Sequence, residues 1–165
     1  MMNSLIHSTT GLIHLLSCLL ALVAGTSILI LTKGSVMHKR IGYVYCLSMI
    51  IINGTAFGLY HLFGKFGPFH FAALISAATL AAGMIPVLFR TKSWLSLHFS
   101  FMYYSVIGLY AAFASEIIVR IPGISFGPAV GIATALVMMT AIYLFRSLST
   151  KWTTQFSSHQ AIKKI

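Results

Sequence analysis

Five runs of mostly apolar residues, each about 20 residues long, alternate with short polar segments along the chain. A helix rises about 1.5 Å per residue, so a run of about 20 residues crosses a hydrocarbon core of about 30 Å. The pattern therefore predicts an all-α integral membrane bundle of five transmembrane helices. We place these spans at residues 11–32, 41–63, 71–89, 95–121 and 129–145, and we expect residues 146–165 to form a basic cytoplasmic tail.

Composition supports a membrane protein, because 58% of the residues are hydrophobic and only 7% are charged. Soluble domains carry about 25% charged residues. The net charge of +10 raises the question of a nucleic-acid partner. We exclude that partner because the Lys and Arg residues stand at the ends of the spans, where they orient helices and contact anionic lipid. The expected partner is therefore the lipid bilayer, with anionic lipid at the basic face.

The basic residues also predict an orientation. Lys65 and Arg120 fall on one side of the five spans, and the other side receives Lys33, Lys39, Arg40, Arg90, Lys92, Arg146, Lys151, Lys163 and Lys164. Cytoplasmic loops carry the excess of Lys and Arg. We therefore expect an outside N-terminus and an inside C-terminus.

The third run, residues 71–89, is dominated by Ala, Gly and Ser. Small residues let helix backbones approach closely in lipid. We therefore expect this helix to lie in the interior of the bundle.

An offset of 60 residues relates parts of spans two and three to spans four and five. His38 aligns with His98, Tyr43 aligns with Tyr103, and the Phe-Gly-Pro sequence at 66–68 recurs at 126–128. An even number of spans separates the two copies, which is typical of a parallel repeat. Chance matches between apolar sequences are an alternative explanation.

The only acidic residue, Glu116, lies within the fourth span. A carboxylate at the centre of a membrane helix costs roughly 2.5–3.5 kcal/mol, so it needs a protein or water partner. At helical spacing it shares one stripe with His98, Met102, Ser105, Leu109 and Ala112, which we expect to face protein. Alternatively, Glu116 pairs with Arg120 four residues later.

The predicted orientation places polar residues in two groups. The outer group is a candidate ligand set for a transition metal or haem, because imidazole and carboxylate ligate such metals: His14, His61, His70 and Glu116. The inner group comprises His38, Arg40 and His98, for which lipid phosphate contact is the alternative use. Asn53 lies near the middle of span two and should hydrogen-bond to another helix.

Three segments carry a family resemblance: HKRIGYVY at 38–45, NGTAFGLYHLFGKFGPFH at 53–70 and HFSFMYYSVIGLYAAFASE at 98–116. With them the chain resembles a family of small bacterial multi-pass membrane proteins, described as predicted membrane proteins with a domain of unknown function, over about residues 33–145. The resemblance implies a helical bundle in the cytoplasmic membrane and brings no substrate or cofactor.

These patterns leave three functional hypotheses. The first is a metal- or haem-binding protein that uses the outer group for redox chemistry or cofactor handling. The second is a proton-coupled transporter in which Glu116 carries a proton and Asn53 and Ser105 line a path. The third is an assembly or scaffold subunit, with a membrane-protein partner or a homo-oligomer, in which Arg120 and the other polar groups only hold helices together. The sequence leaves enzymatic activity open.

Overall fold

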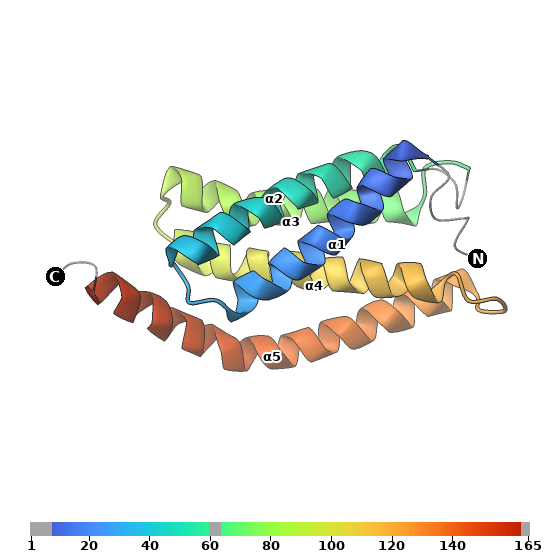
Figure 1. Cartoon of the computed structure of the whole chain (residues 1–165). Helices are drawn as coiled ribbons and strands as arrows, with labels where there is room; N and C mark the ends of the chain where they lie inside the picture. Colours follow the sequence, from blue (N-terminus) through green and yellow to red (C-terminus); the bar gives the residue numbers. More distant parts are fainter. Residues whose placement is uncertain (1–7, 60–63, 163–165) are drawn as a thin grey trace.

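Five helices make up the fold in the computed structural model, which describes residues 8–59 and 64–162. In chain order they are α1 (Thr9–Ile30), α2 (Val36–Ala56), α3 (Pro68–Phe89), α4 (Trp94–Ile118) and α5 (Phe126–Ile162). The described residues contain no strand, which confirms the all-α prediction. The helices lie roughly along one direction, and α5 follows the length of α4 and extends past the rest of the bundle (Figure 1).

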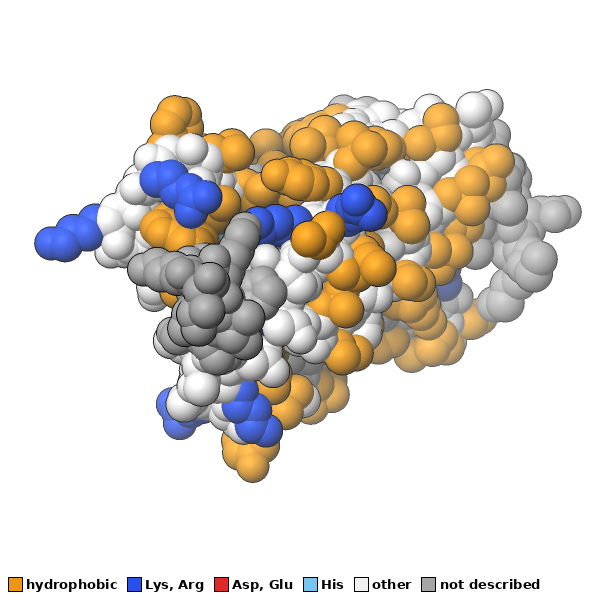
Figure 2. All heavy atoms as spheres, turned by 60° about the vertical axis from the view of Figure 1, so that its left-hand side comes forward, with side chains coloured by type: hydrophobic (Ala, Val, Ile, Leu, Met, Phe, Trp, Pro, Cys, Tyr) orange, Lys and Arg blue, Asp and Glu red, His pale blue; other side chains and the backbone are white. Residues whose placement is uncertain are grey.

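Four of the helices are long and apolar enough to cross a membrane: α1, α3, α4 and residues Phe126–Phe156 of α5. Their outward side chains are hydrophobic, and Lys and Arg side chains gather towards the end of the molecule that faces the viewer in Figure 2. A multi-span membrane protein is therefore confirmed. Helix α2, the second of the five predicted spans, begins with basic residues in its first turns. That α2 spans the membrane stays a prediction, and so does the orientation of the bundle.

Side-chain caps explain why two helices begin before the predicted spans. The Ser8 hydroxyl accepts a hydrogen bond from the Gly11 N–H at 3.1 Å, and the Ser35 hydroxyl accepts one from the His38 N–H at 3.1 Å. Such caps satisfy donors that the first turn of a helix leaves free. Hydropathy locates the apolar centre of a helix, whereas the cap decides where the helix begins.

Helix α4 occupies the centre of the bundle, because it packs against α1, α3 and α5, while α2 packs against α1 and α3. Of the residues in the most apolar stretch of α4, 39% are buried, against 22% in the corresponding stretch of α3. The prediction that the third helix lies in the interior is therefore wrong. Its small residues serve one tight contact instead: a methyl group at Gly83 would lie 2.9 Å from the Met102 sulfur and 3.2 Å from the Met102 backbone nitrogen.

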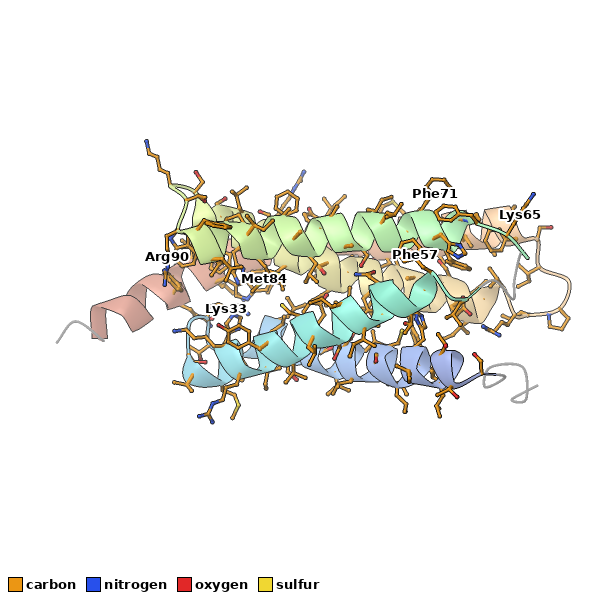
Figure 3. The ribbon with its side chains drawn as sticks, turned by 90° about the horizontal axis from the view of Figure 1, so that it is seen from above. Lys33, Phe57, Lys65, Phe71, Met84 and Arg90 are labelled. Carbon is orange, nitrogen blue, oxygen red and sulfur yellow. The ribbon has the colours of Figure 1, made fainter. Side chains whose placement is uncertain are left out.

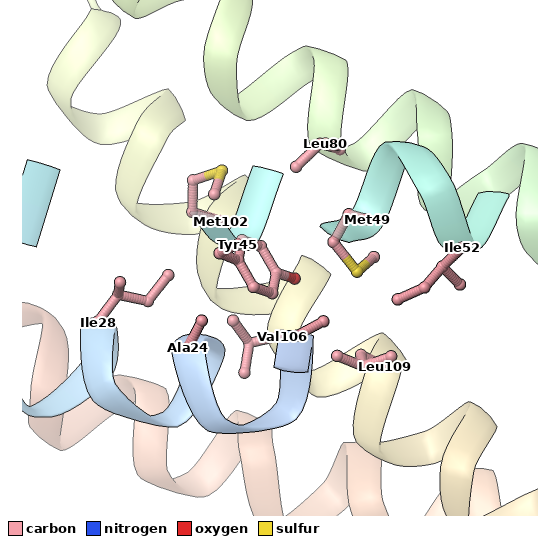
Figure 4. Packing of buried hydrophobic residues seen from close by; sticks show 10 residues of the cluster. Ala24, Ile28, Tyr45, Met49, Ile52, Leu80, Met102, Val106 and Leu109 are labelled. Carbon is pink, nitrogen blue, oxygen red and sulfur yellow. The ribbon is translucent and has the colours of Figure 1, made fainter. Parts of the chain in front are cut away.

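The core between α1, α2 and α4 is built around the side chain of Tyr45, which is fully buried. Its hydroxyl forms a 2.8 Å hydrogen bond with the Ser105 hydroxyl. Gly25 of α1 leaves room for the ring, since a methyl group there would lie 3.1 Å from it and 3.2 Å from Val106. Figure 4 shows Tyr45 between Met102, Val106 and Met49. The predicted stripe on α4 thus faces protein at Met102, Ser105 and Leu109, while Ala112 is exposed.

Helix α5 continues beyond residue 145, where we expected a tail to begin, and ends only at Ile162. The Tyr103 hydroxyl donates a 2.7 Å hydrogen bond to the Ala141 carbonyl and so ties α5 to α4. The helix continues to Trp152, whose side chain is buried and whose ring centre lies 5.7 Å from that of Tyr103. This part of α5 closes one end of the bundle.

Candidate functional site

A cavity of about 190 Å³ lies at the end of the bundle that carries most of the basic residues. Its walls come from the α1–α2 connection, the start of α2, the end of α3, the start of α4 and the closing part of α5. Figure 3 shows Lys33 and Arg90 at this end, opposite Lys65. The basic and histidine side chains in the lining are Lys33, His38, Lys39, Arg90 and His98, and the lining also includes the rings of Trp94, Phe99, Trp152 and Phe156.

Lys33 is a buried cation in this wall, with only 3% of its surface exposed. Its ammonium donates hydrogen bonds to the carbonyls of Ile28 at 2.6 Å and Leu29 at 2.8 Å, and it lies 4.6 Å from the centre of the Trp152 ring. Burial lowers the pKa of this ammonium from its ordinary value of 10.5 to about 8. Two carbonyl oxygens and a ring face contact the ammonium, and no carboxylate of the described residues lies against it.

The cavity wall contains no carboxylate. The only acidic side chain of the chain, Glu116, lies in the last turns of α4, and it forms an ion pair with Arg120 there. The cavity is built from the first turns of α4, so the two regions are at opposite ends of that helix. The ionised side chains that line the cavity are therefore all basic: Lys33, Lys39 and Arg90.

Two histidines from different helices complete the polar lining. The Nδ1 atom of His98 lies 3.0 Å from the Gly83 carbonyl oxygen, which can only accept, so Nδ1 carries the proton and Nε2 is free to accept. The Nδ1 atom of His38 is buried and has no hydrogen-bond partner among the described residues. The two rings are close enough to interact electrostatically. The cavity therefore offers both an accepting nitrogen and an unused one.

Arg90 enters the wall at the end of α3, where it is the helix C-cap with a left-handed backbone at φ 52°. This conformation turns the chain at the end of α3, and the guanidinium lies 5.1 Å from the centre of the Trp94 ring. The αL position normally favours glycine. Arg90 brings a second fixed cation to the cavity rim.

The predicted inner group is therefore found only in part. The structure brings His38 and His98 together in one cavity, whereas Arg40 is exposed and does not line it. Sequence reasoning missed the roles of Lys33 and Arg90, which it used only as orientation charges. The signal for Lys33 was its place directly before Gly34, whose φ of 81° turns the chain back at the end of α1.

The described members of the predicted outer group each make separate contacts. The Thr55 hydroxyl donates to the Ile51 carbonyl and accepts a 2.8 Å hydrogen bond from His14 Nδ1. His70 Nδ1 accepts from the Gly67 N–H at 3.1 Å and so caps α3. Glu116 acts electrostatically on His14 but pairs with Arg120, as the alternative interpretation predicted.

No group of three or more His, Cys, Asp or Glu side chains that could hold a metal occurs within residues 8–59 and 64–156. The fourth predicted ligand, His61, lies outside the described residues. The metal or haem site at this end therefore stays a prediction.

The two residues of the predicted polar path, Asn53 and Ser105, differ in their contacts. Asn53 Oδ1 is buried and has no hydrogen-bond partner among the described side chains and backbone, so the interhelical hydrogen bond that we expected for Asn53 is not found in the described part. Ser105 is occupied by its bond to Tyr45. Ser115, which the sequence did not single out, has a second buried oxygen without a partner among the described residues.

Comparison with known proteins identifies a family. A family model described as "Predicted membrane protein (DUF2306)" matches residues 11–152. This match covers most of the chain and confirms the resemblance seen in its sequence segments. No curated protein and no solved structure matches the chain.

Proposed function

The chain belongs to the DUF2306 family of predicted membrane proteins, and from this premise we propose that it binds an anionic ligand in its basic cavity. The observation that carries the proposal is the buried Lys33 ammonium in a wall without a carboxylate. Buried charges in proteins are normally paired, because an isolated one is costly to remove from water. A bound anion would supply the missing charge.

Lys33 has a donor left for such a ligand. An ammonium has three N–H donors, and the Ile28 and Leu29 carbonyls accept two of them. The third Lys33 donor and His38, in the tautomer that carries its proton on the partnerless Nδ1, give the ligand hydrogen bonds from two different segments. A charge-assisted hydrogen bond of this kind is roughly twice as strong as a neutral one.

The size of the cavity limits the part of the ligand that enters it. Sites for drug-sized ligands measure about 300–1,000 Å³, and a cavity of about 150 Å³ holds benzene. About 190 Å³ therefore suits a small anionic group such as a phosphate, sulfate or carboxylate, with a few attached atoms.

The proposal includes the predicted topology. With five spans, an outside N-terminus and an inside C-terminus, the cavity opens at the cytoplasmic face of a bacterial inner membrane. The 60-residue offset supports a parallel repeat of the two helix pairs, because Tyr45 bonds to Ser105 and His38 shares the cavity with His98 at that same offset.

Equilibrium dialysis of radiolabelled sulfate against protein purified in a neutral maltoside detergent tests this function. The wild type should bind one sulfate saturably, and Lys33→Met should bind it on the order of a hundredfold more weakly. Lys65→Met is the matched control, because Lys65 is an exposed lysine at the other end of the bundle. Equal binding by all three proteins, or no saturable binding to the wild type, would refute the proposal.

Proton-coupled transport is the second candidate, favoured by the buried Asn53 Oδ1 and Ser115 Oγ close in sequence to the ends of α2 and α4. There Glu116 would exchange protons and these atoms would bind a polar solute or water. Proton flux into liposomes should then stop in Glu116→Gln and continue in Arg120→Gln, which removes only the ion-pair partner. A metal analysis and an absorption spectrum of the same samples test the outer group of His14, His61, His70 and Glu116.

A further inference from the structure

We infer that the ligand of the basic cavity is a membrane-resident amphiphile, an alkyl or isoprenyl chain with a small anionic head, that enters sideways between α2 and α3. The inference rests on the proposed anion-binding function and adds the chemical class of the ligand and its route. Three observations on the described residues carry it.

The first observation is the position of the cavity between two neighbouring helices. Gly42, Tyr43 and Cys46 of α2 line one side, and Met84, Val87 and Arg90 of α3 line the other. In Figure 3, α2 and α3 run close together near Phe57 and Phe71 and separate towards Lys33 and Arg90. The cavity therefore has a lateral side as well as an end.

The second observation is that this lateral side is bordered by apolar residues that face outward. Tyr43 and Leu47 of α2 are more than half exposed, and so are Leu88 and Phe89 of α3. In a membrane these exposed side chains contact lipid. A molecule that leaves the cavity on this side passes into hydrocarbon rather than into water.

The third observation concerns Gly42, which leaves the route open. A methyl group built at Gly42 meets no atom within 4 Å, although this glycine lies inside a helix and borders the cavity. Glycine within a helix is less favourable than alanine, and no close backbone contact requires it here. A larger side chain at this position would project into the space between α2 and α3.

Together these features match two parts of one ligand. The anionic head lies against Lys33, His38 and Arg90, and the surrounding Met84, Val87, Leu95 and Met102 offer only apolar contacts. These four apolar side chains suit a hydrocarbon chain. A water-soluble anion would use the head contacts alone and gain nothing from the lateral wall.

Native mass spectrometry in a neutral detergent tests the inference with three probes: decyl phosphate, inorganic phosphate and decanol. The wild type should retain one decyl phosphate at a concentration at least tenfold below that required for inorganic phosphate, and no decanol. Gly42→Leu should weaken decyl phosphate binding at least tenfold and leave inorganic phosphate binding unchanged. Gly54→Leu is the matched control, because Gly54 also lies within α2 in open space but does not line the cavity.

The outcomes separate the two proposals. Equal binding of decyl phosphate and inorganic phosphate, both lost in Lys33→Met, would overturn the amphiphile and keep the anion site. Decyl phosphate binding that survives Lys33→Met, or failure of the wild type to bind either phosphate, would overturn both. Val87→Trp blocks the same route from α3 and replaces Gly42→Leu if that variant does not fold.

Discussion

Lys33→Met allows the charge of the cavity to be tested quantitatively through pH. Methionine keeps the length of the side chain and removes the ammonium. The Lys33 pKa of about 8, against an ordinary 10.5, corresponds to about 3 kcal/mol by which burial disfavours the charged form. A bound anion that restores the ordinary pKa of Lys33 gains up to this free energy in binding. This gain corresponds to an increase on the order of a hundredfold in the affinity for the anion.

The sign of the pH effect follows from linkage. The ligand-free protein keeps the Lys33 proton below about pH 8, and the bound anion keeps it to a higher pH. Sulfate affinity should therefore be nearly constant below about pH 7, fall to about half of its full value at pH 8, and reach about one tenth at pH 9. Unperturbed lysines titrate near 10.4 and histidines near 6.5, so neither class contributes within this window.

Sulfate is the suitable probe because it does not titrate in this range, whereas a phosphate ester has a second pKa near 6. Equilibrium dialysis at half-unit steps from pH 7 to pH 9.5 gives the profile, with Lys65→Met expected to follow the wild type. Lys33→Met should give weak binding that is independent of pH. A wild-type profile that stays flat to pH 9.5, or a Lys33→Met affinity within threefold of the wild type, would refute the reasoning.

Two further predictions concern the elements that build the cavity. A double-mutant cycle of Tyr45→Phe and Ser105→Ala tests their buried hydrogen bond by equilibrium unfolding in mixed detergent micelles. The coupling energy should be about 0.6–1.7 kcal/mol. If the effects of the two single substitutions simply add, the bond contributes nothing. Trp152→Ala should reduce the free energy of unfolding by about 3–5 kcal/mol, because the buried Trp152 ring packs on Tyr103 and faces the Lys33 ammonium. A loss below about 1 kcal/mol would mean that this part of α5 does not pack against the bundle.

The helices of this fold were predictable from apolar runs, because a chain in lipid satisfies its backbone hydrogen bonds within each span. Their ends were less so. The expected tail at residues 146–165 is helical to Ile162, because its polarity ends the hydrophobic surface but no Pro or Gly interrupts the helix. Small residues in the third run likewise predicted close packing correctly at Gly83, but they do not specify how many sides of a helix are covered.

The candidate site was predictable for residues whose position along a span determines which residues of the other spans lie beside them. His38 and His98 stand at matching inner positions of two spans, and the fold brings them into one cavity. Lys33 shows where this reasoning ends, since a lysine at a span end can extend to the headgroups or fold back onto free carbonyls of the last turn. The choice depends on Trp152, which lies more than a hundred residues later and covers the ammonium.

The central position of α4 has a consequence for biogenesis. Helix α4 follows three other helices in the chain, so α1 and α2 leave the ribosome and meet each other before their shared core partner exists. Until Ser105 and Val106 arrive, the Tyr45 hydroxyl and the space beside Gly25 lack the partners that they have in the final structure. We therefore expect the α1–α2 hairpin to remain incompletely packed until α4 joins it.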